Sequence, residues 1–313
     1  MEHSLLFGNG LNRLSESFSW ENLLKDLSEI QFDEGIPNTI KYEMIISSMP
    51  FAKYSKIQTH DGFNIILSDG SYLVTEDKII EEELKSNIAK KVSEFSDNEI
   101  YKKILSFDFA NYLTTNYDTA LLKSAANVGF KSSPFNVEVC SEIFHCLKFT
   151  LNNKEFKYWA IHGIESNPNS IMLGFDQYCD SVSKISTYVK NGDPNLKIDP
   201  LFVRLNSNDF DRAKSWVDLF FVSHLHIIGL GLDFTEIDLW WLLVKRKRIK
   251  LQYPELIKNK IYFYSPEPIL KGKKSVLKYL DIEVVEYEEK TPKISFLNYN
   301  FLLNQMVCNI NEN

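Results

Sequence analysis

Short apolar runs alternate with amphipathic segments from about residue 109 onward, and this pattern predicts the fold. Each apolar run fits a buried strand, and the segments between them fit helices. Together with residues 5–7, the predicted strands are 111–115, 135–139, 147–151, 156–161, 171–173, 224–228, 260–264 and 282–285. The predicted helices are 118–126, 209–220, 235–244 and 275–280. This alternation indicates an α/β fold with a Rossmann-like, doubly wound, mostly parallel sheet.

Residues 19–108 interrupt the pattern after the first strand and are mostly helical in character. Ser19 is expected to cap a helix whose apolar face includes Leu23 and Leu24. Helices are also predicted over 79–95 and 99–107. Two Asp-Gly pairs favour a hairpin or extended excursion over 57–74. The predicted organisation is a sheet domain of residues 1–18 and 109–313 with a helical insertion or subdomain at 19–108.

Composition narrows the function classes. Of the 313 residues, 44% are hydrophobic, which excludes a disordered chain. A net charge of −7 makes direct nucleic-acid binding unexpected. The longest apolar stretch, 216–234, carries aspartates and histidines, so a membrane span is not expected.

The four cysteines, at positions 140, 146, 179 and 308, include no C-x-x-C pair. No zinc ribbon or other metal site is therefore expected. Scattered thiols without a secretory signal favour the cytoplasm.

The first predicted strand runs directly into Gly8-Asn9-Gly10, followed by Asn12 and Arg13. Two glycines allow a tight turn and let backbone N–H groups approach a phosphate closely. The third glycine of the dinucleotide-binding fingerprint is missing, because Arg13 occupies its place. By itself this segment fits either a phosphate-binding loop or an ordinary β-to-α turn.

Two further strands are predicted to deliver polar side chains to the same edge of the sheet. One is followed by Thr114-Thr115-Asn116-Tyr117-Asp118. Asp118 fits an ordinary helix cap, which leaves Asn116 and the threonines unexplained. The other strand ends in His162-Gly163. A lone histidine is more often structural, but this one lies where a parallel sheet binds its ligand.

A fourth segment repeats the order of strand, Gly-x-Gly turn and helix. Gly229-Leu230-Gly231 follows an apolar run, and Asp233 and Thr235-Glu236-Ile237-Asp238 come next. Asp233 or Thr235 is expected to cap the helix, and the acidic residues favour its N-terminus. All four segments end predicted strands on the ligand side, so they supply the candidate site.

In this order the segments resemble the sirtuin-like NAD-binding superfamily, specifically its zinc-less prokaryotic branch found in anti-phage defence. The resemblance spans residues 5–245 and also rests on a Trp20-Glu21-Asn22-Leu23-Leu24 helix. The segment Ile171-Met172-Leu173-Gly174-Phe175-Asp176 is similar to abortive-infection members. The chain departs from protein-deacetylating sirtuins in lacking their four-cysteine zinc module and their Ile-Pro-Asp-Phe-Arg loop.

The resemblance implies that Asn116 and His162 are the catalytic pair of an NAD⁺-cleaving enzyme. Breaking the nicotinamide–ribose bond develops oxocarbenium character, and the leaving group is already cationic, so no general acid is needed. Asn116 would orient water or ribose hydroxyls, and His162 would act as the base. The implied NAD⁺-binding residues are Gly8, Asn9, Gly10, Asn12, Arg13, Thr115, Asp118, Gly229, Gly231 and Asp233.

Each part of the NAD⁺ molecule has an expected partner. Backbone N–H groups near Gly8 and Gly10, with Asn12 and Arg13, would hold the pyrophosphate. Asp118 would contact the nicotinamide end or hold its loop. The segment from Gly229 to Asp233 would face the adenine ribose.

The function expected from the resemblance is NAD⁺ hydrolysis that depletes NAD⁺ in abortive infection. Two alternatives stay open. One is NAD⁺-dependent ADP-ribosyl transfer or deacylation, and the other is a non-catalytic subunit that binds NAD⁺ or ADP-ribose. By analogy with relatives, control is expected through homo-oligomerisation or a separate partner, such as an ATPase or an Argonaute-type protein.

Overall fold

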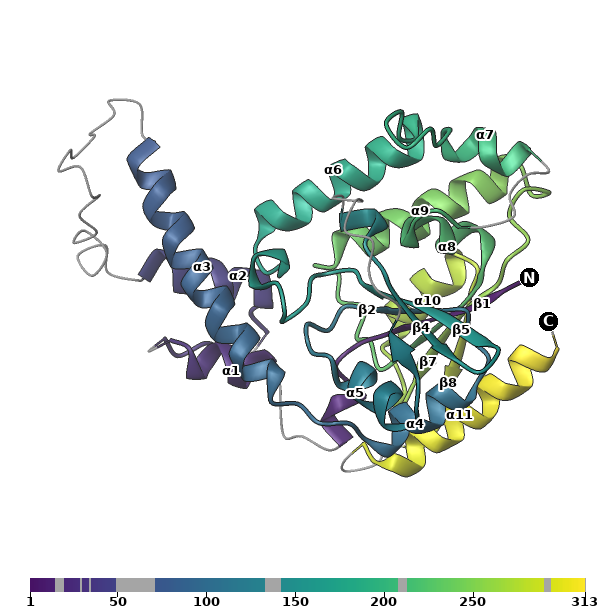
Figure 1. Ribbon diagram of the computed structural model, residues 1–313, viewed down its shortest axis with the longest axis horizontal. Coiled ribbons are helices and arrows are strands. Elements are labelled where there is room, and N and C mark those ends of the chain that lie inside the picture. Colours follow the sequence, from purple (N-terminus) through teal and green to yellow (C-terminus); the bar gives the residue numbers. More distant parts are fainter. Residues whose placement is uncertain are drawn as a thin grey trace.

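An eight-stranded sheet runs through the molecule and confirms the α/β, Rossmann-like fold (Figure 1). The computed structural model describes residues 1–14, 20–28, 30–33, 35–48, 71–132, 142–207, 213–289 and 294–312. The strands are β1 (His3–Phe7), β2 (Asn111–Thr114), β3 (Lys131–Ser132), β4 (Leu147–Leu151), β5 (Lys154–Ala160), β6 (His224–Ile228), β7 (Ile261–Ser265) and β8 (Ile282–Glu286).

The strand order is β3-β4-β5-β2-β1-β6-β7-β8. The strands from β5 to β8 in this order pair in parallel, and β3 and β4 add an antiparallel edge. If the six parallel strands β1, β2, β5, β6, β7 and β8 are numbered 1 to 6 in chain order, their order across the sheet is 3-2-1-4-5-6. This is the strand order of dinucleotide-binding folds. The order reverses between β1 and β6, which is where such a sheet binds its ligand.

The register of the central strands brings their last residues to one level. Phe7 of β1 lies beside Thr114 of β2 and Ile228 of β6, and Thr114 lies beside Ala160 of β5. The loops that follow these strands therefore leave the sheet side by side.

Helices cover both faces of the sheet. They are α1 (Trp20–Asp26), α2 (Asn38–Ser48), α3 (Ser71–Ser93), α4 (Glu99–Ser106), α5 (Ala120–Asn127), α6 (Phe175–Asn191), α7 (Leu201–Asn206), α8 (Trp216–Val222), α9 (Ile237–Gln252), α10 (Lys271–Tyr279) and α11 (Phe296–Asn311). Because side chains alternate along a strand, Leu5 and Phe7 pack into one core cluster with α4, α5 and α11. Leu6 packs into the other cluster, with α6, α8, α9 and α10.

The chain between β1 and β2 holds α1 to α4, so its described residues are mostly helical, as predicted. Leu84 and Ile88 of α3 belong to the same core cluster as Leu5 and Phe7. Figure 1 shows α1, α2 and α3 together at the end of the molecule toward which β1 runs. The insertion therefore packs against the sheet near its ligand side, while its division from the sheet domain stays a prediction.

Some predicted elements differ from the structure. Residues 171–173 are not a strand: they are buried coil that leads into α6, and the Met172 N–H donates to the carbonyl of His162 at 3.0 Å. Residues 71–74, expected to be extended, begin α3. The helix predicted over 209–220 begins only at Trp216, where the Ser215 hydroxyl accepts the Val217 N–H at 3.2 Å.

Other predictions lie outside the described residues, including the Ser19 cap, the strand at 135–139 and the excursion at 57–70. The pattern also missed α6, α7 and α11. In the part of the chain that the structure describes, no helix is both long and apolar enough to cross a membrane.

Three histidines form a cluster on the sheet, in which His224 stacks on His3 and His3 is hydrogen-bonded to His226. Nδ1 of His3 and Nε2 of His226 lie 3.0 Å apart, and Nδ1 of His226 lies 3.0 Å from the Tyr264 hydroxyl. Burial, reinforced by the neighbouring imidazoles, lowers the pKa of His226 to about 3 and that of His224 to about 4. These residues are therefore neutral in the folded protein at neutral pH.

This cluster predicts a loss of stability in acid. The unfolded chain protonates His226 near pH 6.5, whereas the folded chain does so only near pH 3. Between these limits the unfolded state binds more protons, so stability falls as the pH falls. Replacing His226 with glutamine should reduce this slope by about 1.4 kcal/mol per pH unit. Urea unfolding at several pH values measures it, and parallel curves for the two proteins would contradict the assignment.

Candidate functional site

A cavity of about 540 Å³ lies at the point where the strand order reverses, and we call it the switch-point cavity. Its walls come from the loops after β1, β2, β6 and β7 and from Tyr299 of α11. The predicted site residues that line it are Asn9, Gly10, Arg13, Thr115, Asn116, Gly229, Gly231 and Asp233. The structure thus brings most of the predicted set together.

A second cavity, of about 380 Å³, adjoins the first and is called the His162 cavity. His162, Tyr117 and Tyr178 line it on the sheet side, and the start of α2 lines it on the insertion side. The residues common to both walls are Asn38, Thr115, Asp233 and Glu236. The predicted catalytic residues therefore face adjoining cavities, Asn116 the first and His162 the second.

The two glycine loops pack directly against each other. The N–H of Gly10 donates to the carbonyl of Gly229 at 2.7 Å, and the N–H of Gly8 donates to the carbonyl of Ile228 at 3.3 Å. A Cβ on Gly10 would meet the Gly229 oxygen at 2.7 Å, so this contact requires glycine. The expectation that these two N–H groups hold a pyrophosphate is corrected, because both are already bonded to carbonyl oxygens. Gly8 itself does not line either cavity.

Asn12 and Asp118 are buried beneath the cavities and do not line them. Nδ2 of Asn12 donates to Oδ2 of Asp118 at 2.7 Å, and the Ala120 N–H donates to Oδ1 at 3.0 Å. The Tyr101 hydroxyl donates to Oδ1 of Asn12 at 2.6 Å. Burial raises the pKa of Asp118 to about 6, against the effect of these hydrogen bonds. Of the two roles expected for Asp118, the structure shows the one of holding its loop, whereas Asn12, expected at the pyrophosphate, joins it in tying the loop after β1 to the loop after β2.

Asn116 presents a buried amide at the switch-point cavity. The backbone N–H of Asn116 donates to the Thr114 hydroxyl at 3.0 Å, and that hydroxyl donates to the carbonyl of Phe7 at 3.1 Å. The side chain is only 4% exposed, and its Nδ2 has no hydrogen-bond partner among the described residues. Buried amide donors are nearly always hydrogen-bonded, so this orphaned donor marks a place for a ligand acceptor. Nδ2 of Asn9, on the same cavity, is orphaned as well.

His162 is paired with a carboxylate that the sequence analysis assigned only to a helix end. Nε2 of His162 lies 2.9 Å from Oδ2 of Asp238 in α9, and both side chains are buried. Burial by itself would lower the pKa of His162, but Asp238, with help from Glu236, outweighs it and raises the pKa above 6.5. Since Nε2 is bonded to Asp238, Nδ1 is the nitrogen left for a ligand.

Gly163 holds this histidine in place through the backbone. Its φ is +104°, and a Cβ there would lie 2.3 Å from the carbonyl oxygen of Ser170. Only glycine fits this turn without displacing the segment that follows. The close approach lets the coil before α6 pack beneath His162.

Glu236 is a second acidic residue that sequence reasoning missed as a site residue. It lines both cavities, and its Oε2 is buried without a hydrogen-bond partner in the described parts of the chain. Burial raises the pKa of Glu236 to about 7, although the charge of His162 opposes this. Asp233 does not cap α9 as expected: its Oδ1 accepts the N–H and hydroxyl of Thr235, and α9 begins at Ile237.

The switch-point cavity carries charges of both signs. Arg13 and Lys273 line it alongside Asp233 and Glu236. The Lys273 ammonium donates to the carbonyl of Gly231 and lies 5.2 Å from the ring centroid of Phe263. A ligand that combines anionic and cationic groups matches this lining.

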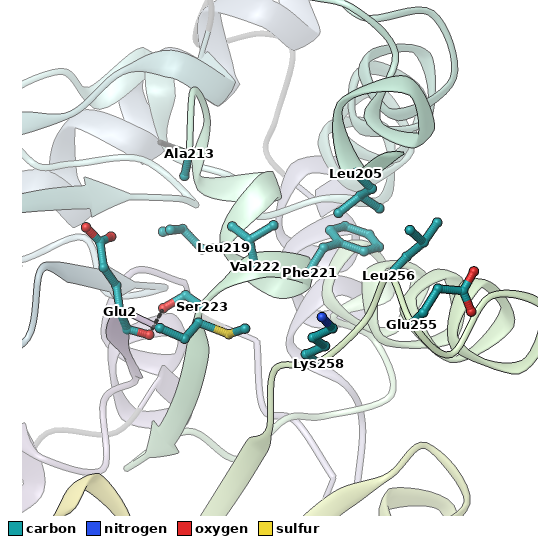
Figure 2. A pocket seen from close by; sticks show the side chains of 11 residues that line it. Glu2, Leu205, Ala213, Leu219, Phe221, Val222, Ser223, Glu255, Leu256 and Lys258 are labelled. Carbon is teal, nitrogen blue, oxygen red and sulfur yellow. Dashed lines mark hydrogen bonds between the residues drawn. The ribbon is translucent and has the colours of Figure 1, made fainter. Parts of the chain in front are cut away.

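A third cavity, of about 490 Å³, lies at the amino ends of β1 and β6 (Figure 2). Figure 2 shows Glu2 and Ser223, which precede these strands, beside apolar side chains such as Leu219 and Val222. None of the predicted site residues lines it. The predicted site residues therefore indicate that the site lies at the carboxyl edge of the sheet.

Comparison of the chain with models of protein families and with curated proteins found no match. Among the residues that the structure describes, no group of three or more His, Cys, Asp or Glu side chains could hold a metal ion.

The His162–Asp238 pair makes a direct prediction. In D238N the pKa of His162 should fall. Burial lowers this pKa, and once the Asp238 charge is removed only Glu236 is left to raise it. NMR titration of the imidazole measures it. S181A is the matched control, since the Ser181 hydroxyl lies 3.5 Å from the same carboxylate oxygen without carrying charge. An unchanged pKa in D238N would show that the pair does not set the charge of His162.

Proposed function

We propose that the protein hydrolyses NAD⁺ to nicotinamide and ADP-ribose. One observation carries the proposal: Asn116 and the Asp238-paired His162 leave adjacent parallel strands, β2 and β5, and face adjoining cavities at the ligand edge of the sheet. An orphaned amide donor beside a carboxylate-supported histidine suits a reaction that needs an oriented water and a base. The resemblance of the motifs to the zinc-less sirtuin-like branch supports the same reaction.

The chemistry follows from these two side chains. The Asn116 amide would donate to a ribose hydroxyl or to the attacking water. The bond between C1′ and the nicotinamide nitrogen breaks, and its electron pair leaves with neutral nicotinamide. The water oxygen bonds to C1′, and its proton passes to Nδ1 of His162. ADP-ribose, nicotinamide and a proton are the products.

The carboxylates stabilise the charge that moves during this step. The positive charge starts on the nicotinamide ring and shifts to the ribose as the bond breaks. Asp233 and Glu236 line both cavities, so their field would act on the ring and the ribose alike. Arg13 and Lys273 would instead attract the pyrophosphate.

The biological role proposed from the resemblance is depletion of NAD⁺ in abortive anti-phage defence. Such an activity must be held off at rest. Control through homo-oligomerisation, or through a separate ATPase or Argonaute-type protein, is proposed by analogy with the relatives.

The test is to incubate the purified protein with NAD⁺, alone and with the protein of a neighbouring gene, and to identify the products. The wild type should release nicotinamide and ADP-ribose in equal amounts. N116A and H162A should lower the rate by about 10²- to 10⁴-fold while remaining folded. Because the base must be neutral and its pKa is raised, the rate should increase as the pH rises above 6.5. N127A and H145A are the matched controls on exposed residues.

The outcomes separate the alternatives. ADP-ribose attached to a protein, or loss of an acyl group, would indicate transfer chemistry instead of hydrolysis. NAD⁺ that binds without being consumed under any of these conditions would indicate a non-catalytic binding subunit. Equal rates for the wild type, N116A and H162A would refute the assigned pair.

A further inference from the structure

The N-terminus of α2 opens into the His162 cavity. Asn38, Thr39 and Lys41 all line this cavity, and Asn38 also lines the switch-point cavity. Within the described parts of the chain, the N–H groups of Asn38, Thr39 and Ile40 donate no hydrogen bond. The first turn carries no acidic residue. The positive end of the helix dipole therefore faces the cavity without a counter-charge in the first turn of the helix.

The side chain of Thr39 gives a second, independent indication that a ligand binds here. Thr39 is only 4% exposed, and its hydroxyl has no hydrogen-bond partner among the described residues. A buried hydroxyl without a partner is costly, and a ligand acceptor would remove that cost. It lies on the same turn as the unused N–H groups, so all these donors share one wall of the cavity.

Lys41 brings a full positive charge to this wall. It is 4% exposed, and its ammonium lies 5.8 Å from the ring centroid of Phe32. An ammonium, a hydroxyl and free N–H groups together are the donors that bind a phosphate.

We propose that the N-terminus of α2 is a phosphate subsite and that it takes the phosphate on the nicotinamide side of NAD⁺. This assignment rests on the proposed function. Asp233 and Glu236 lie on the same cavity and repel a phosphate, so the phosphate lies at α2 and the cationic ring lies toward the carboxylates. The glycine loops cannot supply this contact through Gly8 and Gly10, because those N–H groups are already bonded to carbonyls.

The experiment compares nicotinamide mononucleotide with nicotinamide riboside, which lacks the phosphate, by calorimetry on the full chain. The mononucleotide should bind the wild type at least about tenfold more tightly. T39V and K41M should bring the two affinities together while leaving riboside binding unchanged. K102M is the control, since it removes a lysine charge from an exposed ion pair on α4. Melting curves check folding, and the near-isosteric T39V keeps the test intact if K41M unfolds.

Inorganic phosphate, titrated separately, distinguishes the source of the anion. Phosphate that competes with the mononucleotide but binds more weakly supports the subsite, whereas phosphate that binds as tightly as the mononucleotide overturns the assignment to a nucleotide. Equal affinity of the wild type for mononucleotide and riboside also overturns it. NAD⁺ hydrolysis, measured on the same samples, separates the two claims: turnover with no phosphate preference refutes the subsite alone, and phosphate preference without turnover refutes the hydrolase alone.

Discussion

The backbone contact between the loops after β1 and β6 is the constraint on which the ligand edge depends. The Gly10 N–H bonds to the Gly229 carbonyl at 2.7 Å, and neither loop could approach so closely with a side chain at Gly10. This contact joins the two halves of the sheet at the point where the strand order reverses. Arg13 and Asp233, which follow the two loops, are thereby brought to one cavity. The glycines thus build the edge of the site, and the N–H groups of Gly8 and Gly10 are already bonded in building it.

Buried polar side chains form the rest of the site at this edge of the sheet, and burying them lowers the stability of the fold. His162 and Asp238 are almost fully buried, and each depends on the other, because removing one partner of such a pair leaves an uncompensated buried charge. Asn116, Asn9, Thr39 and Glu236 each leave a buried polar atom without a partner in the described chain. Four of the eight such atoms in the described chain line these two cavities, and orphaned polar atoms on a cavity wall are typical of a site organised for a ligand.

Much of the sheet could be predicted because each strand is a short local run, and the polar residues that follow a strand mark its ligand end. Long-range contacts could not be read in this way. Asp238 lies 76 residues from His162, so its sequence context showed only a helix N-terminus. The apolar run at 171–173 suggested a strand, but it is buried as coil, and apolar character cannot distinguish the two. The partner of Asp118 was also hidden, because Asn12 lies 106 residues away in the sequence.

The central claim is that the ligand binds at the carboxyl edge of the sheet, across the switch-point and His162 cavities. A crystal structure of N116A with NAD⁺ tests it most directly, because this substitution should slow turnover and leave the cavities in place. The account predicts electron density with the pyrophosphate beside Arg13 and α2 and with the nicotinamide ring near His162 and Glu236. Density for NAD⁺ in the amino-end cavity of Figure 2 instead would contradict it.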